Sequence, residues 1–180
     1  MVILGVDPGL ITTGVVAVRC QGAQLTVLDS REIKTRSRDT LPVRLRCIYE
    51  GLEREISTHR PDSLVLEKIF SHAHHPAAAL ALGHARGVIA LVAGRHDIPL
   101  IELPATRVKR AVTSRGHASK QQVQRMVSQL TGLQSPIASE HVADALALVV
   151  AYSHTLFVTA IMENTNHDRK TDRRTGKTRV

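Results

Sequence analysis

Two short apolar segments of this chain each end in an acidic residue, and this pattern constrains the fold more than any other feature. Residues 2–6 end at Asp7, and residues 64–66 end at Glu67. Uninterrupted apolar runs of this length predict strands that are covered on both faces. The carboxyl end of such a strand is where ligands bind in open α/β sheets. One acid there can simply mark where a strand meets solvent, but two together indicate a site.

The other elements alternate as in an α/β protein with a mixed central sheet flanked by helices. Residues 13–19 and 25–33 are rich in β-branched residues around a Gln21-Gly22 turn, so the first three strands are predicted to be antiparallel. A further strand is predicted at residues 99–103, and alternation with helices makes the later strands parallel. Apolar residues at helical spacing predict helices at residues 40–60, 77–94, 105–112, 119–130 and 139–154.

The composition is that of one ordinary globular domain. The 180 residues leave no room for a second catalytic domain. No uninterrupted apolar run approaches the roughly 20 residues that a membrane span needs, and the first residues lack the basic region of a secretory signal. We therefore expect a cytoplasmic protein with no membrane partner. Cys20 and Cys47 have no metal-ligand spacing, so we expect neither a disulfide nor a zinc site.

The charge favours a polyanionic partner. Lysine and arginine number 24 against 16 acids, which gives a net charge of +8, and phosphates attract such a protein over long range. Residues 163–180 carry six basic and three acidic side chains and scarcely any apolar ones, so we expect a disordered basic tail there. With two Phe, two Tyr and no Trp, the chain cannot build a row of stacked aromatics, which argues against a single-strand binding module.

A third acid and a histidine lie near the start of the last predicted helix. His141 and Asp144 are three residues apart and share a helix face that continues through Leu148 toward the core. Such a pair can be purely structural. Together with Asp7 and Glu67, however, it provides three hard oxygen ligands and one imidazole, which suit Mg²⁺ or Mn²⁺ better than Zn²⁺.

A basic run between two predicted helices is suited to backbone phosphates. In isolation such a run is usually solvated surface, but beside a candidate metal site it favours contact with the phosphates of a polyanion. We expect Lys120 also to offset negative charge at that site. The residues concerned are Lys109, Arg110, Arg115 and Lys120, with His117 among them.

Phe70 and three histidines follow the second acid. Phe70 is either a core residue or, in a chain with only four aromatics, a residue with a function. His72, His74 and His75 have no oxygen or sulfur ligand beside them, so phosphate or solvent contact is favoured over metal binding.

Several short strings, in order along residues 1–154, together resemble one known family, the bacterial RuvC Holliday-junction resolvases. None is decisive alone, because an acid after a first strand recurs in many folds. The strings are Gly5-Val6-Asp7-Pro8-Gly9, Thr13-Gly14, Leu66-Glu67-Lys68-Ile69-Phe70, Gly83-His84-Ala85-Arg86-Gly87, Val108-Lys109, Lys120-Gln121-Gln122-Val123 and Ala143-Asp144-Ala145-Leu146-Ala147.

The resemblance implies a ribonuclease-H-like fold, with residues 1–156 as the nuclease domain. It also implies a homodimer that cuts four-way DNA junctions by paired symmetric nicks, with a branch-migration motor of the RuvAB type as partner. The family's catalytic carboxylates match Asp7, Glu67 and Asp144, and His141 stands where many members have a fourth acid. Phe70 matches an aromatic residue thought to engage bases at the crossover.

The resemblance also implies roles for two basic residues and a two-metal mechanism. Lys109 and Lys120 match basic residues near the DNA and the active site. Two ions per site are expected: one activates water and the other steadies the departing 3′ oxygen, which leaves a 5′ phosphate. Asp7 would bridge the ions, Glu67 would hold one, and Asp144 with His141 would hold the other.

The sequence also departs from the family pattern and leaves alternatives open. Leu10-Ile11 replaces polar and basic residues, His84 replaces a common Gln, and Glu140 could supply a carboxylate in place of His141. The small residues of helix 77–94 could face a second subunit or the chain's own sheet. Two other functions remain to be compared: a phosphotransferase of the sugar-kinase and actin type, and a non-catalytic structural DNA-binding protein.

Overall fold

The computed structural model describes residues 1–68, 76–113, 116–132, 137 and 139–175, with side chains placed as far as residue 163. These residues contain three strands, then a helix, strand, helix and strand, and finally three helices. The strands are β1 (Val2–Asp7), β2 (Thr12–Gln21), β3 (Gln24–Lys34), β4 (Ser63–Glu67) and β5 (Leu100–Leu103). The helices are α1 (Leu41–His59), α2 (Pro76–Arg95), α3 (Ala105–Thr113), α4 (Lys120–Leu130) and α5 (Glu140–Thr175).

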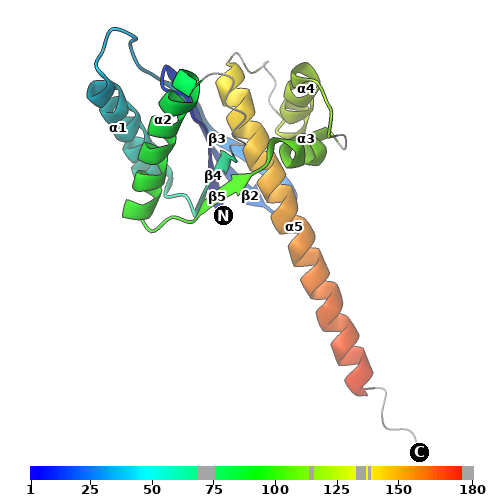
Figure 1. Ribbon diagram of the computed structural model, residues 1–180. Helices are drawn as coiled ribbons and strands as arrows, with labels where there is room; N and C mark the ends of the chain where they lie inside the picture. Colours follow the sequence, from blue (N-terminus) through cyan, green and yellow to red (C-terminus); the bar gives the residue numbers. More distant parts are fainter. Residues whose placement is uncertain (69–75, 114–115, 133–136, 138, 176–180) are drawn as a thin grey trace, which may run out of the picture.

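The strands form one mixed sheet in the order β3-β2-β1-β4-β5. β1 pairs antiparallel with β2, and β2 with β3, whereas β1, β4 and β5 are parallel neighbours. Helices α1 and α2 cover one face, and α5 crosses the other face with α3 and α4 beside it (Figure 1). The predicted mixed sheet with flanking helices is therefore confirmed.

Local sequence signals account for the ends of the helices. Thr40 precedes α1 in extended conformation. Arg60 caps the other end of the helix with a left-handed φ of 45°, and the next residue, Pro61, cannot continue a helix. The α4 helix begins at a capping box, in which Ser119 and Gln122 satisfy each other's backbone N–H groups.

Helix α5 is much longer than the sequence predicts. We expected it to end near His154, whereas the backbone stays helical to Thr175 and projects from the body (Figure 1). No glycine or proline interrupts the chain between Ser139 and Gly176, so nothing in this stretch stops a helix. The change to a polar sequence after His154 therefore does not end the helix.

Two helices, α2 and the part of α5 up to Glu163, are long and apolar enough to pass for membrane spans. Neither helix contains an uninterrupted apolar run of about 20 residues, so a criterion based on such runs does not detect them. The first half of α5 has an ordinary reason for its composition, because Ala145, Leu146 and Val149 are buried against the sheet. In α2, Ala85, Ile89 and Val92 face the core in the same way.

The opposite face of α2 is exposed and apolar. Leu80 and Leu91 are 64% and 57% exposed. A Cβ added at Gly83 or Gly87 would meet no atom within 4 Å. The small-residue face of this helix therefore does not pack on the chain's own sheet, which removes one of the two alternatives that the sequence left open.

Candidate active site

The sheet places the first two acids side by side. β1 and β4 are parallel and in register, with Val6 opposite Leu66, so Asp7 and Glu67 follow neighbouring positions at the same edge. The buried residues before them fix this arrangement, because both strands are covered on both faces.

Helix α5 reaches this edge because two glycines let its backbone lie directly on the sheet. A Cβ at Gly5 would meet the carbonyl oxygen of Ala145 and lie 2.6 Å from Val149 Cγ2. A Cβ at Gly14 would meet the carbonyl of His141 and lie 2.9 Å from its Cβ. Since Gly14 is paired with Asp7 in the sheet, this close approach sets His141 next to Asp7.

The side chains of α5 then contact the acids and a lysine of α4. His141 Nδ1 lies 2.7 Å from Asp7 Oδ2, within hydrogen-bond distance. Lys120 Nζ lies 3.2 Å from Asp144 Oδ2 and 2.9 Å from Glu140 Oε2. Glu140 is 72% exposed and turned toward Lys120, whereas His141 is the residue beside Asp7.

The negative charges of the carboxylates at this edge repel one another. Burial raises the pKa of Asp7, and the charge of Asp144 adds to this, although the hydrogen bond with His141 opposes it. Burial likewise raises the pKa of Glu67, with further contributions from Asp7 and Asp144, while Lys109 opposes them. Ionised carboxylates held together at such a cost favour a bound cation.

The donors at this edge are of the kinds that a hard divalent ion prefers. Three carboxylates and one imidazole are neighbours there, and no cysteine is among the donors. No three of these four side chains place their ligand atoms within 4.8 Å of one another. A pocket of about 270 Å³ adjoins the acids. Lys109 and Lys120 line it together with Glu67 and Asp144, so positively charged side chains that can bind phosphates lie beside the acids.

Arg86 of α2 is a supporting residue that the sequence reasoning missed. Its Nη1 donates to the backbone carbonyl of Glu67 at 2.5 Å, and its Nη2 pairs with Glu102 of β5. The contact fixes the end of β4 that carries the catalytic candidate. Arg86 lies in one of the strings that carry the family resemblance, but nothing in the sequence shows that it reaches Glu67.

The structure separates the predicted DNA-contacting residues into groups. Lys109 and Lys120 lie beside the acids, whereas Arg110 lines a different pocket on the other side of α3. Phe70 and Arg115 lie outside the described residues, as do the histidines at positions 72, 74 and 75.

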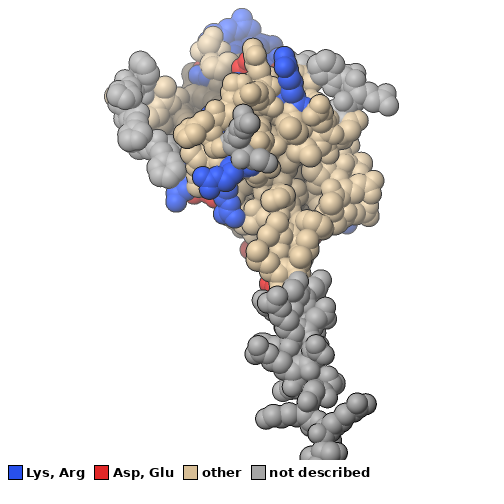
Figure 2. Space-filling model, turned by 90° about the vertical axis from the view of Figure 1, so that its right-hand side faces the viewer, with Lys and Arg blue, Asp and Glu red and all other residues tan. Residues whose placement is uncertain are grey.

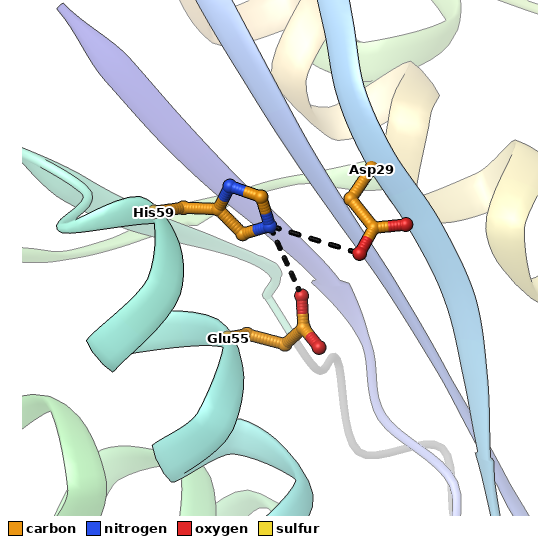
Figure 3. A group of neighbouring side chains, drawn as sticks. All are labelled: Asp29, Glu55 and His59. Atoms are coloured by element: carbon orange, nitrogen blue, oxygen red, sulfur yellow. Dashed lines mark ion pairs between the residues drawn. The ribbon is translucent and has the colours of Figure 1, made fainter.

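A second cluster of acids lies away from this site, between β3 and α1. His59 Nε2 lies 3.7 Å from Asp29 Oδ2 and 3.6 Å from Glu55 Oε2 (Figure 3). The ligand atoms of the three side chains all lie within 4.8 Å of one another, a spacing that would allow them to share a metal. Arg31 already supplies a positive charge, however, because its Nε lies 2.9 Å from Glu55 Oε1 and its guanidinium also pairs with Asp29. We interpret the cluster as an ion network that ties α1 to the edge strand.

This network predicts a pH-dependent loss of stability in Arg31→Gln. Glu55 is buried, and burial raises its pKa despite the nearby Arg31. Near pH 7 the variant leaves a buried charge without its cation, at a cost of about 1–3 kcal/mol in the free energy of unfolding. The cost should shrink as the pH falls through the raised pKa, because Glu55 then binds a proton and loses its charge.

Urea denaturation of Arg31→Gln at about pH 7 and about pH 5 measures this effect. Arg46→Gln is the matched control, since Arg46 forms an exposed pair with Glu50 on the same helix. An equal loss of stability at both pH values would contradict the interpretation.

Comparison with known proteins agrees with these observations. A family model described as crossover junction endodeoxyribonuclease RuvC matches residues 3–154. A protein of that name from Rhodopirellula baltica is 43% identical over 146 residues, which cover 81% of this chain and 82% of the relative. Another, from Alkaliphilus metalliredigens, is 38% identical over 154 residues, covering 86% and 93%.

Solved structures agree in fold. RuvC of T. thermophilus, solved in complex with Holliday junction substrate, matches with a TM-score of 0.84 at 26% identity, over 88% of this chain and 96% of that one. The yeast mitochondrial Holliday junction resolvase Ydc2 matches with a TM-score of 0.60 at 11% identity, which concerns the fold alone. The expected ribonuclease-H-like fold is thereby confirmed. The chain belongs to the RuvC family of crossover junction endodeoxyribonucleases.

Proposed function

We propose that this protein is a divalent-metal-dependent endonuclease that resolves four-way DNA junctions during recombination and repair. The convergence of Asp7, Glu67 and Asp144 at one edge of the sheet supports this most, because such a group of acids favours bound cations. Membership of the RuvC family makes junction DNA the substrate and phosphodiester hydrolysis the reaction.

Each residue of the site has a role in the proposed mechanism. Asp7 contacts His141, and burial together with the charge of Asp144 raises the pKa of Asp7. Asp7 would bridge two Mg²⁺ or Mn²⁺ ions. Glu67 would hold one ion, and Asp144 with His141 the other. When bound, the ions supply an activated water and stabilise the departing 3′ oxygen, which leaves a 5′ phosphate. Lys120, 3.2 Å from Asp144, would offset charge on the reacting phosphate.

The DNA would be held mainly through its phosphates. Lys109 and Lys120 flank the acids and would contact the strand that is cut. Arg110 and Arg115 would hold more distant phosphates, and Phe70 would engage bases at the crossover, as the family resemblance implies. Residues 1–156 would form the nuclease domain, with residues 163–180 as a basic tail beyond it.

His141 should give the site a preference for Mn²⁺. Imidazole is a softer ligand than carboxylate, and Mn²⁺ accepts nitrogen more readily than Mg²⁺ does. His141→Asp should therefore remain active and shift its preference toward Mg²⁺, whereas His141→Ala should cut about 10²-fold more slowly with either ion. Initial cutting rates in each metal measure this. If His141→Ala cuts as fast as the wild type, Glu140 becomes the candidate for the fourth ligand.

The exposed face of α2 is the proposed dimer surface. A two-fold symmetric dimer would present two equal sites to the junction and nick opposite strands in pairs. Leu91→Glu should give a monomeric mass in light scattering and uncoupled nicks, because it places a charge in an apolar interface. Leu130→Glu, at an exposed leucine of α4, is the control and should keep the mass of the wild type. A wild type that is already monomeric would contradict the dimer.

Two further proposals rest on family membership. The protein would act in the cytoplasm, where its DNA substrate is, without a membrane partner. The intact junctions that it cuts would be delivered by a branch-migration motor of the RuvAB type.

A labelled synthetic junction tests the function directly. The wild type should cut it in Mg²⁺ or Mn²⁺, leave a linear duplex of the same sequence intact, and lose activity in EDTA. Binding without cutting in any divalent metal would favour a structural DNA-binding protein. ATP turnover without cutting would favour a phosphotransferase.

A further inference from the structure

A second, strongly basic pocket lies between α3 and α5. Its volume is about 570 Å³. Two guanidinium groups, an imidazole and three hydroxyl groups line it: those of Arg107, Arg110, His154, Thr106, Thr155 and Thr159. Figure 2 shows basic side chains gathered on this side of the body, just above the point where α5 leaves it.

The arginines of this pocket are not neutralised. Among the residues with described side chains, no carboxylate lies within 4 Å of Arg107 or Arg110. Arg107 Nη2 instead donates to Thr155 Oγ1 at 3.4 Å, which holds the guanidinium at the wall of the pocket. Arg31 and Arg86, by contrast, each pair with an acid. Two unpaired guanidinium groups in one hollow favour an anion.

The chemistry of the lining selects a phosphate. A guanidinium group can donate two hydrogen bonds to one phosphate, and two such groups line the pocket. The hydroxyl groups of Thr155 and Thr159 already donate to backbone carbonyl groups of α5, so the arginines are the principal donors. The pocket also lies close to the reaction. Val108 and Lys109 line the pocket of the catalytic acids, while Arg107 and Arg110 line this one, so α3 separates the two.

The spacing along α5 sets the distance between the pockets. Asp144 borders the catalytic pocket and Thr155 borders the basic one. Eleven residues of helix separate them, or about 16 Å at 1.5 Å per residue. Phosphates of one DNA strand recur every ~3.4 Å along the helix axis and also turn about that axis, so this distance spans a few nucleotides.

We infer that this pocket binds a backbone phosphate of a junction arm, a few nucleotides from the phosphodiester that is cut. The inference rests on the proposed function and adds a second anchoring point to it. Arg107 and Thr155 are the residues that define it, since neither belongs to the catalytic group. The contact would fix the direction in which the arm leaves the active site.

A double-mutant cycle between protein and DNA tests the inference. Junction binding is measured in Ca²⁺ for the wild type and Arg107→Gln, with single uncharged methylphosphonate linkages placed at successive positions along one arm. At one position a few nucleotides from the cut, the replacement should weaken wild-type binding about 10-fold and weaken Arg107→Gln no further. Arg107→Lys should keep part of the affinity because it keeps the charge.

The control is Arg19→Gln, which removes one exposed charge at the opposite end of β1 and β2. It should bind and cut like the wild type. Arg107→Gln should also reduce the slope of log affinity against log salt by about 1.

Other outcomes are distinguishable. Equal losses for both proteins at every linkage would overturn the inference. Binding of inorganic phosphate that depends on Arg107, with unchanged junction affinity, would also overturn it and assign the pocket to a free anion. If the wild type neither binds nor cuts junctions, the proposed function itself fails.

Discussion

Asp7→Asn is expected to abolish cutting of four-way junctions while leaving junction binding intact. The substitution removes the carboxylate that contacts His141 and that would bridge the metal ions. We expect the cutting rate to fall by at least about 10³-fold, because the charge that holds the ions is lost from the centre of the site. The basic residues that hold phosphates are untouched, so the dissociation constant for the junction should change less than about 3-fold.

The same variant should be more stable than the wild type when no metal is added. Burial and the charge of Asp144 raise the pKa of Asp7, so its ionised form opposes folding above that pKa. Replacing it with a neutral amide removes this cost, and the Tm should rise. Single-turnover cutting, gel shifts in Ca²⁺ and thermal melts in EDTA measure the three effects. Loss of binding in proportion to cutting would contradict the assignment of Asp7.

Gly14→Ala is expected to impair both stability and cutting. The added Cβ would meet the backbone carbonyl of His141, so α5 must move away from the sheet. Overpacking of this kind typically costs 1–3 kcal/mol, and misplacing catalytic groups by about 1 Å can cost about 10²-fold in rate. The effect on cutting should persist at temperatures where the variant is fully folded.

Gly94→Ala provides the matched control for stability. A Cβ at Gly94 would meet no atom within 4 Å, and alanine is the better helix former. Its Tm should equal or exceed that of the wild type. Unchanged cutting by folded Gly14→Ala would contradict the idea that glycine at this position sets the distance between α5 and Asp7.

The sequence predicts most of the fold because its strands are marked by local patterns. Residues 2–6 and 64–66 are continuous apolar runs, and both form central strands of the sheet. Arg60-Pro61 ends α1 as expected, because proline cannot continue a helix. The predicted end of α5 near His154 was wrong. The sequence becomes polar beyond that residue, but it contains no helix-breaking residue before Gly176.

The candidate site is predictable only in part, for a physical reason. The acids are visible because each follows an apolar strand or shares a helix face with a histidine. Arg86 and the pocket of Arg107 are not visible, because their roles depend on residues far away in the chain that packing brings together. The role of Gly14 likewise depends on a helix more than a hundred residues later.

Mapping the cuts in one four-way junction tests the central claim most directly. Each strand is end-labelled in turn, and the products formed by the wild type in Mn²⁺ and in Mg²⁺ are resolved at single-nucleotide resolution. We predict nicks at symmetry-related positions on two opposite strands, each with a 5′ phosphate that ligase can reseal, and none in Asp7→Asn. Intact junctions in both metals, or cuts that Asp7→Asn makes equally well, would contradict the account.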